Sequence, residues 1–187
     1  MSLKIGIIGP TNLDKLSDLT GKPVDFFLAR AQEIGRMIAE SDSELFINAD
    51  KGMTIKIAQA YKENQGKKLT IFYPEKAEPW PDGHIQQYKD FADEIKIERD
   101  WFWANYGVVS FPDICICVGL SAGTLSELAY VKWNCLLNRG NLKKLIVVKD
   151  MVREGRIPPE IEVDIGETLH YVQDIEGIKD FLEQKYE

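Results

Sequence analysis

The sequence has few of the residues that build metal centres or disulfide frameworks. Of its 187 residues, only three are cysteines and two are histidines, and an odd, small number of cysteines gives no disulfide framework. Cys115 and Cys117 would share one face of a strand and could hold a metal there, but no third or fourth ligand lies nearby in the sequence. We therefore expect buried thiols in a cytoplasmic protein, with no metal and no cofactor.

Basic residues and long apolar runs are also scarce. The chain has 23 lysines and arginines against 30 acidic residues, a net charge of −7, whereas nucleic acids and acidic membrane surfaces require a basic footprint. No apolar run approaches the roughly 20 residues of a membrane span, and the N-terminal one is too short for a signal peptide. This balance predicts no nucleic-acid partner and no membrane partner, but it is compatible with a small anionic ligand.

What the sequence does contain is the pattern of an alternating α/β domain. Short apolar runs of strand length lie at 4–9, 44–48, 69–73, 114–118 and 145–148, with a short edge strand expected at 170–172. Between them, helical spacing of apolar residues predicts helices over 23–40, 52–64, 90–106, 124–137 and 175–185. Continuously apolar strands indicate a sheet covered on both faces. We predict one domain over residues 1–187 with a three-layer Rossmann-like α/β fold and a mainly parallel sheet.

The most informative segment joins the apolar run 114–118 to the helix expected from residue 124. Its small residues let a ligand approach the backbone, and free N–H groups at the helix start can hold a phosphate. Thr124 and Glu127 also have the spacing of a capping box, so the spacing leaves Glu127 open as a helix cap or as a site residue. The candidate phosphate-binding residues in this segment are Gly119, Ser121, Ala122, Gly123 and Thr124.

A second candidate segment follows the first expected strand. Gly9, Pro10 and Thr11 come directly after an apolar run, and ligands of parallel sheets bind beyond the carboxyl ends of the strands. Gly9 can border a nucleotide and Thr11 can donate to a phosphate. A tight turn between strand and helix is the alternative interpretation of this segment.

The residues 113–127 resemble the signature of the Lonely-guy (LOG) phosphoribohydrolases and their molybdenum-cofactor-carrier-like relatives. That signature is an aspartate, five apolar strand residues and then P-G-G-x-G-T-x-x-E. Gly123, Thr124 and Glu127 match its fixed positions outright, and Leu125 also matches the family. Gly119 replaces the leading proline, while Leu120 and Ser121 replace the two glycines. The chain is thus similar to a divergent member of this Rossmann-like superfamily.

The resemblance implies a nucleoside-monophosphate-type ligand and, in active members, cleavage of the bond between base and ribose. It makes Glu127 the catalytic residue and adds Asn105 to the ligand-binding set. The arginine that works beside the glutamate in active members is replaced here by Ala104. The functions left open are a phosphoribohydrolase, a non-catalytic nucleotide or ribose-phosphate binder, and a structural or interaction protein that has lost the ligand. Departures at Leu120, Ser121, Ala104 and Asp50 favour altered or lost chemistry.

Aromatic residues are concentrated at 101–106, and they can stack a base, form a buried helix face or form a subunit contact. On the helix expected over 90–106, the apolar surface is wider than one layer covers. We therefore predict a homodimer, as the resemblance also implies, that buries one or more of Trp101, Trp103 and Tyr106. Trp80 and His84 lie on a proline-rich loop and are either lid residues or ordinary surface residues.

Overall fold

A computed structural model describes residues 2–76, 78 and 83–183. Trp80 and the side chain of His84 lie outside the described part, so their roles stay predictions. The sheet has seven strands in the order β4-β3-β2-β1-β5-β6-β7, and every neighbouring pair is parallel. The strands are β1 (Lys4–Ile8), β2 (Glu44–Asn48), β3 (Lys68–Pro74), β4 (Glu94–Glu98), β5 (Ile114–Cys117), β6 (Lys144–Val148) and β7 (Leu169–Val172).

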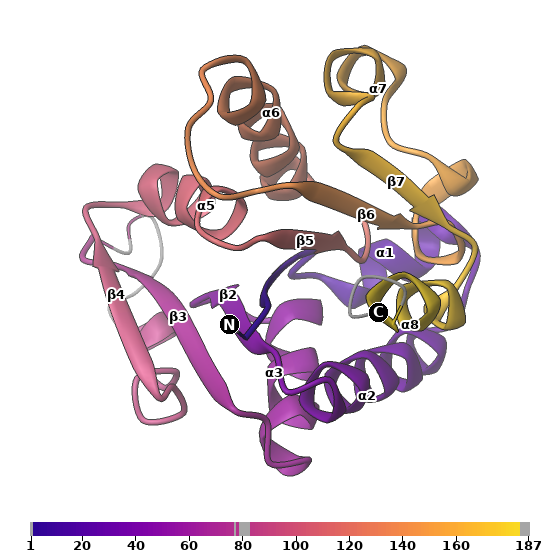
Figure 1. Cartoon of the computed structure of the whole chain (residues 1–187). Coiled ribbons are helices and arrows are strands. Elements are labelled where there is room, and N and C mark those ends of the chain that lie inside the picture. Colours follow the sequence, from indigo (N-terminus) through magenta and orange to yellow (C-terminus); the bar gives the residue numbers. More distant parts are fainter. Residues whose placement is uncertain (1, 77, 79–82, 184–187) are drawn as a thin grey trace.

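Helices cover both faces of this sheet (Figure 1). One face is covered by α1 (Leu13–Thr20), α2 (Val24–Glu40), α3 (Met53–Glu63) and α8 (Ile175–Glu183). The other is covered by α5 (Trp101–Ser110), α6 (Ala122–Leu136) and α7 (Pro159–Ile165). Short pieces complete the chain, namely α4 (Gly83–Gln86), η1 (Lys149–Met151) and η2 (Arg153–Gly155). The predicted three-layer α/β fold with a parallel sheet is confirmed.

The strand order reverses between β1 and β5. From β1 the chain builds outward through β2 and β3 to β4, and from β5 it builds the other way through β6 to β7. Ile5 and Ile114 are register partners across the reversal. In α/β proteins, ligands bind at the carboxyl ends of the strands where the strand order reverses, and we call this region the crevice.

The helix predicted over 90–106 is wrong in its first half. Residues 94–98 form the edge strand β4, paired with β3, and α5 begins only at Trp101. Asp100 ends the strand connection and caps the helix, because its carboxylate accepts from the N–H groups of Phe102 and Trp103 at 3.0 and 3.2 Å. The sequence of β4 alternates charged and apolar residues with the period of two that favours a strand. The apolar residues of β4 and α5 happen to continue one helical spacing, and this led to the prediction of a single long helix.

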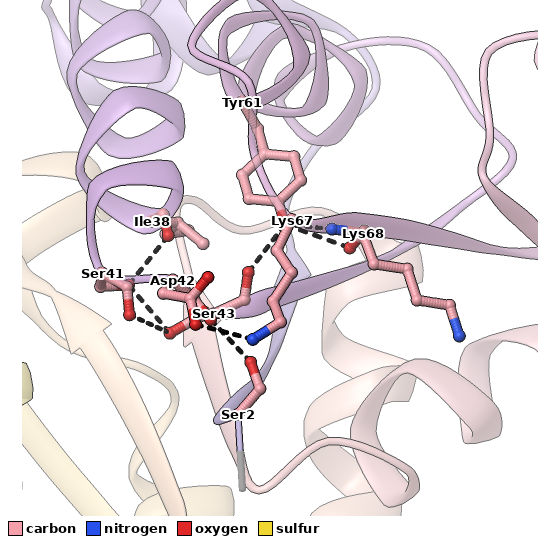
Figure 2. A network of polar contacts seen from close by, with 8 residues as sticks. All are labelled: Ser2, Ile38, Ser41, Asp42, Ser43, Tyr61, Lys67 and Lys68. Carbon is pink, nitrogen blue, oxygen red and sulfur yellow. Dashed lines mark hydrogen bonds and ion pairs between the residues drawn. The ribbon is translucent and has the colours of Figure 1, made fainter.

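A polar network closes the amino end of the sheet (Figure 2). The buried Tyr61 hydroxyl donates to the Ser43 carbonyl at 2.7 Å and accepts from the Lys68 N–H at 2.9 Å. Burial raises the pKa of Tyr61 to about 12, so it remains a neutral donor. Around it, Lys67 pairs with Asp42 at 2.6 Å. These contacts tie α3 to the starts of β2 and β3, at the end of the sheet opposite to the crevice.

Candidate functional site

The structure brings the two predicted glycine segments together at the carboxyl ends of β1 and β5. Gly119 has a φ of +142°, and a Cβ there would lie 2.8 Å from Cδ of Pro10. At Gly9, a Cβ would lie 2.7 Å from Cγ2 of Val118. Both approaches are too close for a larger side chain. The segments 9–11 and 119–121 are therefore packed against each other at the point where the strand order reverses.

Helix α6 begins two residues earlier than the sequence indicated. Its N-cap is Ser121, whose hydroxyl accepts from the Thr124 N–H at 3.2 Å and lies 3.0 Å from the Thr124 hydroxyl. Ala122 and Gly123 form the exposed start of the first turn. The first N–H groups of a helix have no intrahelical acceptor. The candidate residues 121–124 thus form a helix N-terminus directed toward the crevice.

Glu127 is not part of a capping box. Its side chain is buried, with 6% of its surface exposed, and its Oε1 accepts a hydrogen bond from Nδ2 of Asn48 at 2.9 Å. The same Nδ2 lies 2.9 Å from Oδ1 of Asn105, and Nδ2 of Asn105 lies 3.4 Å from Oγ of Ser126. Three elements thus meet here, since Asn48 ends β2, Asn105 lies on α5 and Glu127 lies on α6.

The surroundings of Glu127 disfavour its charged form. Burial raises the pKa of Glu127 well above its ordinary value, the hydrogen bond from Asn48 opposes this, and the charge of Asp50 adds to it. Among the residues that the structure describes, no lysine or arginine contributes to this pKa. The position of the expected arginine holds Ala104, which is buried in the apolar core. A neutral carboxyl in this place can donate a hydrogen bond as well as accept one.

The two cysteines of β5 lie near enough to Glu127 for its charge to act on their thiols. Cys115 and Cys117 are buried free thiols. Burial raises the pKa of Cys117 to about 12 and raises that of Cys115 well above its ordinary value, with Glu127 adding to both shifts. In the described part of the chain, no group of three or more histidine, cysteine or acidic side chains could hold a metal ion. Nor is any described helix long and apolar enough to cross a membrane.

Asn48 is a candidate site residue that no sequence pattern singled out. The signal available was the strand Glu44–Asn48, in which three apolar residues are followed by a polar one. At the carboxyl end of a parallel strand, such a residue faces the crevice region. Its contact with Glu127 joins positions 79 apart in the sequence, and no spacing within either segment predicts it.

The aromatic residues at 101–106 do not form one surface. Trp101 packs against the core on the α2 and α3 side. Tyr106 stands between Trp103 and Tyr130, with ring centroids 6.0 and 5.8 Å apart. Phe102 is 73% exposed. This arrangement extends the exposed aromatic surface from α5 onto α6.

A pocket of about 520 Å³ lies elsewhere, between α2 and α8. Its lining includes Met37 and Ile175 together with charged side chains such as Arg36, Glu40 and Lys179. The C-terminal end of α2 leads into the start of β2, so this pocket is near the amino end of the sheet. The predicted residues around Glu127 do not line it.

Comparison with known proteins identifies relatives of this architecture. A model described as the SLOG cluster4 family matches residues 2–156. No curated protein matches the sequence. Among solved structures, the molybdenum cofactor carrier protein from Chlamydomonas reinhardtii is similar with a TM-score of 0.67 and 17% identity over 98% of each chain. The molybdenum cofactor binding protein from Rippkaea orientalis has a TM-score of 0.69 and 17% identity over 100% of this chain and 99% of that one. These findings confirm the expected resemblance.

One further structure corrects an expectation from the net charge. DNA processing protein A from Helicobacter pylori, described by its single-stranded DNA binding mode, has a TM-score of 0.64 and 14% identity over 99% of this chain and 82% of that one. The exclusion of a nucleic-acid partner is therefore wrong, because this fold is compatible with DNA binding. Net charge averages over the whole surface, whereas binding depends on the local distribution of charge.

Proposed function

Because the chain belongs to the SLOG cluster4 family, we propose that it binds a small phosphate-bearing ligand of the nucleoside monophosphate class. The site is the crevice at the carboxyl ends of β1, β2 and β5. The observation that carries the proposal is the start of α6 beside a buried polar group, Asn48 with Glu127, at the reversal of the strand order. A helix N-terminus provides N–H donors for phosphate, and buried polar groups provide specificity for the rest of a ligand.

The proposed roles follow from this placement. The ligand phosphate binds at the start of α6, and the segment 9–11 forms the facing wall of the crevice. Glu127 and Asn105 face the sugar or base. The phosphate-binding residues of this proposal are Gly9, Pro10, Thr11, Gly119, Ser121, Ala122, Gly123 and Thr124.

Binding without cleavage is the version that the electrostatics favour. An N-glycosidase that uses Glu127 needs an ionised carboxylate, which stabilises the positive charge that develops on the sugar. Burial and Asp50 raise the pKa of Glu127 instead, and Ala104 supplies no cation. Incubation with nucleoside monophosphates, followed by chromatography for free base, tests this version. Base release by the wild type that Glu127→Gln abolishes would restore the hydrolase.

The binding proposal is tested by thermal shift with a panel of nucleoside monophosphates, ribose 5-phosphate, nucleosides and a short single-stranded DNA. A ligand at 100 times its Kd adds about 2.7 kcal/mol to the free energy of unfolding. We expect the phosphate-bearing small molecules to raise the Tm and the nucleosides to leave it unchanged. No shift with any compound favours the interaction protein, and a shift with DNA alone overturns the small-ligand proposal.

A matched pair of variants locates the phosphate. Ala122 and Ala129 are both exposed on α6, but only Ala122 lies in its first turn. Ala122→Glu adds a negative charge beside the proposed phosphate, and we expect it to abolish the shift by repulsion. Ala129→Glu adds the same charge about two turns away and should leave the shift intact. Equal shifts in the two variants would place the phosphate elsewhere.

The proposal includes a homodimer formed through the outer face of α5 and α6. Exposed large apolar side chains lie at the start of α5 and at the end of α6, namely Phe102, Trp103, Trp133, Leu136 and Leu137, and exposed apolar patches mark interfaces. Sedimentation at micromolar concentration should give twice the 21.3 kDa chain mass. Trp133→Glu should produce monomers, whereas Ile97→Glu, at an exposed position on β4, should not. A monomeric wild type contradicts the dimer.

A cytoplasmic location completes the proposal. Its support is that all three cysteines are free thiols, which is usual in a reducing compartment. Cell fractionation followed by immunoblotting provides the test, and recovery outside the cytoplasmic fraction contradicts it.

A further inference from the structure

Asn48 has a buried carbonyl oxygen without a hydrogen-bond donor. The residue is 7% exposed, and its Nδ2 is engaged with Glu127 and Asn105. Its Oδ1 has no partner among the described residues. Buried polar atoms are nearly always paired, so an unpaired one needs a physical explanation.

A second buried asparagine shows what a structural role looks like. Asn134, seven residues after Glu127 on α6, donates its Nδ2 to the Val109 carbonyl at 3.3 Å and also has an unpartnered Oδ1. That hydrogen bond ties α6 to α5 through the backbone. Asn48 instead contacts two side chains, and it does so at the carboxyl end of β2, where the proposed site lies.

We infer that Asn48 is a positioning residue whose amide N–H holds Glu127 and Asn105 together and whose carbonyl oxygen accepts a hydrogen bond from an O–H or N–H group of the bound ligand. The inference rests on the proposed function, because the ligand is the one proposed there. It narrows the ligand to molecules that carry a hydroxyl or amino group beside the phosphate, such as those of a pentose or a nucleobase.

An amide side chain suits position 48 because it adds no charge beside the acidic side chains of Glu127 and Asp50. The titratable groups that face Glu127 are Asp50 from the segment after β2 and the thiols of Cys115 and Cys117 on β5. Each of them disfavours a further negative charge. The Asn48 N–H is the group that supports the carboxylate form of Glu127, so its loss should shift the titration of Glu127 upward.

The positioning role is tested without any ligand. The Glu127 carboxyl is titrated by NMR with glutamate labelled at Cδ, in the wild type, Asn48→Leu and the matched control Asn134→Leu. We expect a higher titration midpoint for Glu127 in N48L and an unchanged one in N134L. An unchanged midpoint in folded N48L overturns the positioning role. If N48L does not fold, Asn48→Ala serves in its place, with the same two outcomes.

The acceptor role is tested by calorimetry with the panel compound that gives the largest thermal shift. We expect N48L to weaken its binding by about tenfold, the effect of one lost hydrogen bond, and N134L to bind like the wild type. Equal affinity of N48L and the wild type overturns the acceptor role. If the wild type binds no compound, the proposed function and the acceptor role fail together, while the NMR titration still decides the positioning role.

Discussion

The two ends of the parallel sheet use buried polar groups in opposite ways. At the amino end, the Tyr61 hydroxyl has an acceptor for its proton and a donor for its oxygen. At the carboxyl end, Asn48 keeps a carbonyl oxygen unpaired within the described structure, and Glu127 is buried beside the negative charge of Asp50. The first arrangement holds the fold, whereas the second costs stability until something completes it. Among the described residues, unpaired buried oxygens also occur at Thr70 and Asn134. What distinguishes the end proposed to bind the ligand is an unpaired amide oxygen whose own N–H is hydrogen-bonded to a buried carboxyl.

Removing the Tyr61 side chain, whose hydroxyl has both of its hydrogen-bond partners, should have the largest effect on stability. Tyr61 is fully buried, so Tyr61→Ala leaves a cavity and strands the Ser43 carbonyl and the Lys68 N–H. We expect the free energy of unfolding to fall by about 3–5 kcal/mol, measured by urea denaturation. Tyr61→Phe keeps the ring and should lose about 1–3 kcal/mol. Equal losses for the two variants would show that the hydrogen bonds, and not the packing, dominate at this end.

The buried carboxyl of Glu127 should lower the free energy of unfolding, and this loss should depend on pH. The pKa of Glu127 is raised in the folded chain, so between the unfolded and folded pKa values the folded state holds a proton that the unfolded state has released. The free energy of unfolding therefore falls as pH rises through this interval, by at most about 1.4 kcal/mol per pH unit. Glu127→Gln should remove this fall and gain stability relative to the wild type with rising pH.

A control for that prediction is available on β4. Lys68 lowers the pKa of Glu94, so the stability from this pair is present above the unfolded pKa and is lost as pH falls. Glu94→Gln should lose stability relative to the wild type at neutral pH and approach it in acid. Parallel pH profiles of wild type and E127Q would contradict the raised pKa of Glu127.

Loss of the N-cap of α6, at the carboxyl end of the sheet, should have a smaller effect on the free energy of unfolding. Ser121→Ala removes the acceptor for the Thr124 N–H and should cost about 1 kcal/mol in the ligand-free protein. Ser126→Ala, which removes a hydroxyl bonded to the Gly123 carbonyl within the same helix, should cost less. If the order of the two losses is reversed, Ser121 is not the effective cap.

The smallest effect is expected at the surface of the amino-end network. Lys67 and Asp42 form an ion pair of 2.6 Å between exposed side chains, and solvent screens such pairs. Lys67→Ala should change the free energy of unfolding by less than about 0.5 kcal/mol. A loss comparable to that of Tyr61→Phe would mean that the ion pair holds the buried hydroxyl in place.

The fold could be predicted wherever one local pattern decided the element. The apolar runs located β1, β2, β3, β5 and β6 because strands buried on both faces are continuously apolar. The edge strand β4 was missed, although its alternation favours a strand, because Ile95 continues a helical spacing with Phe91 and Phe102. The spacing of apolar residues alone does not show where the two-residue period of a strand ends and the 3.6-residue period of a helix begins.

The site could be predicted in its segments but not in its contacts. The small residues before α6 and the resemblance indicated residues 119–127. The cap at Ser121 was missed because Thr124 and Glu127 have capping-box spacing, whereas burial of Glu127 against β2 decides the outcome. Asn48 was missed because its role depends on side chains from α5 and α6 that only tertiary structure brings to it.

The pairing of β1 with β5 also sets the order in which the molecule can assemble during synthesis. Ile5 cannot pair with its register partner Ile114 until the intervening chain has been synthesised. At about 5–20 residues per second, this takes on the order of ten seconds. Strands β1 to β4 can pair among themselves before then. The proposed site at the carboxyl ends of β1 and β5 is therefore expected to form late, after the ribosome has released α6, and a nascent chain stopped before that point should lack it.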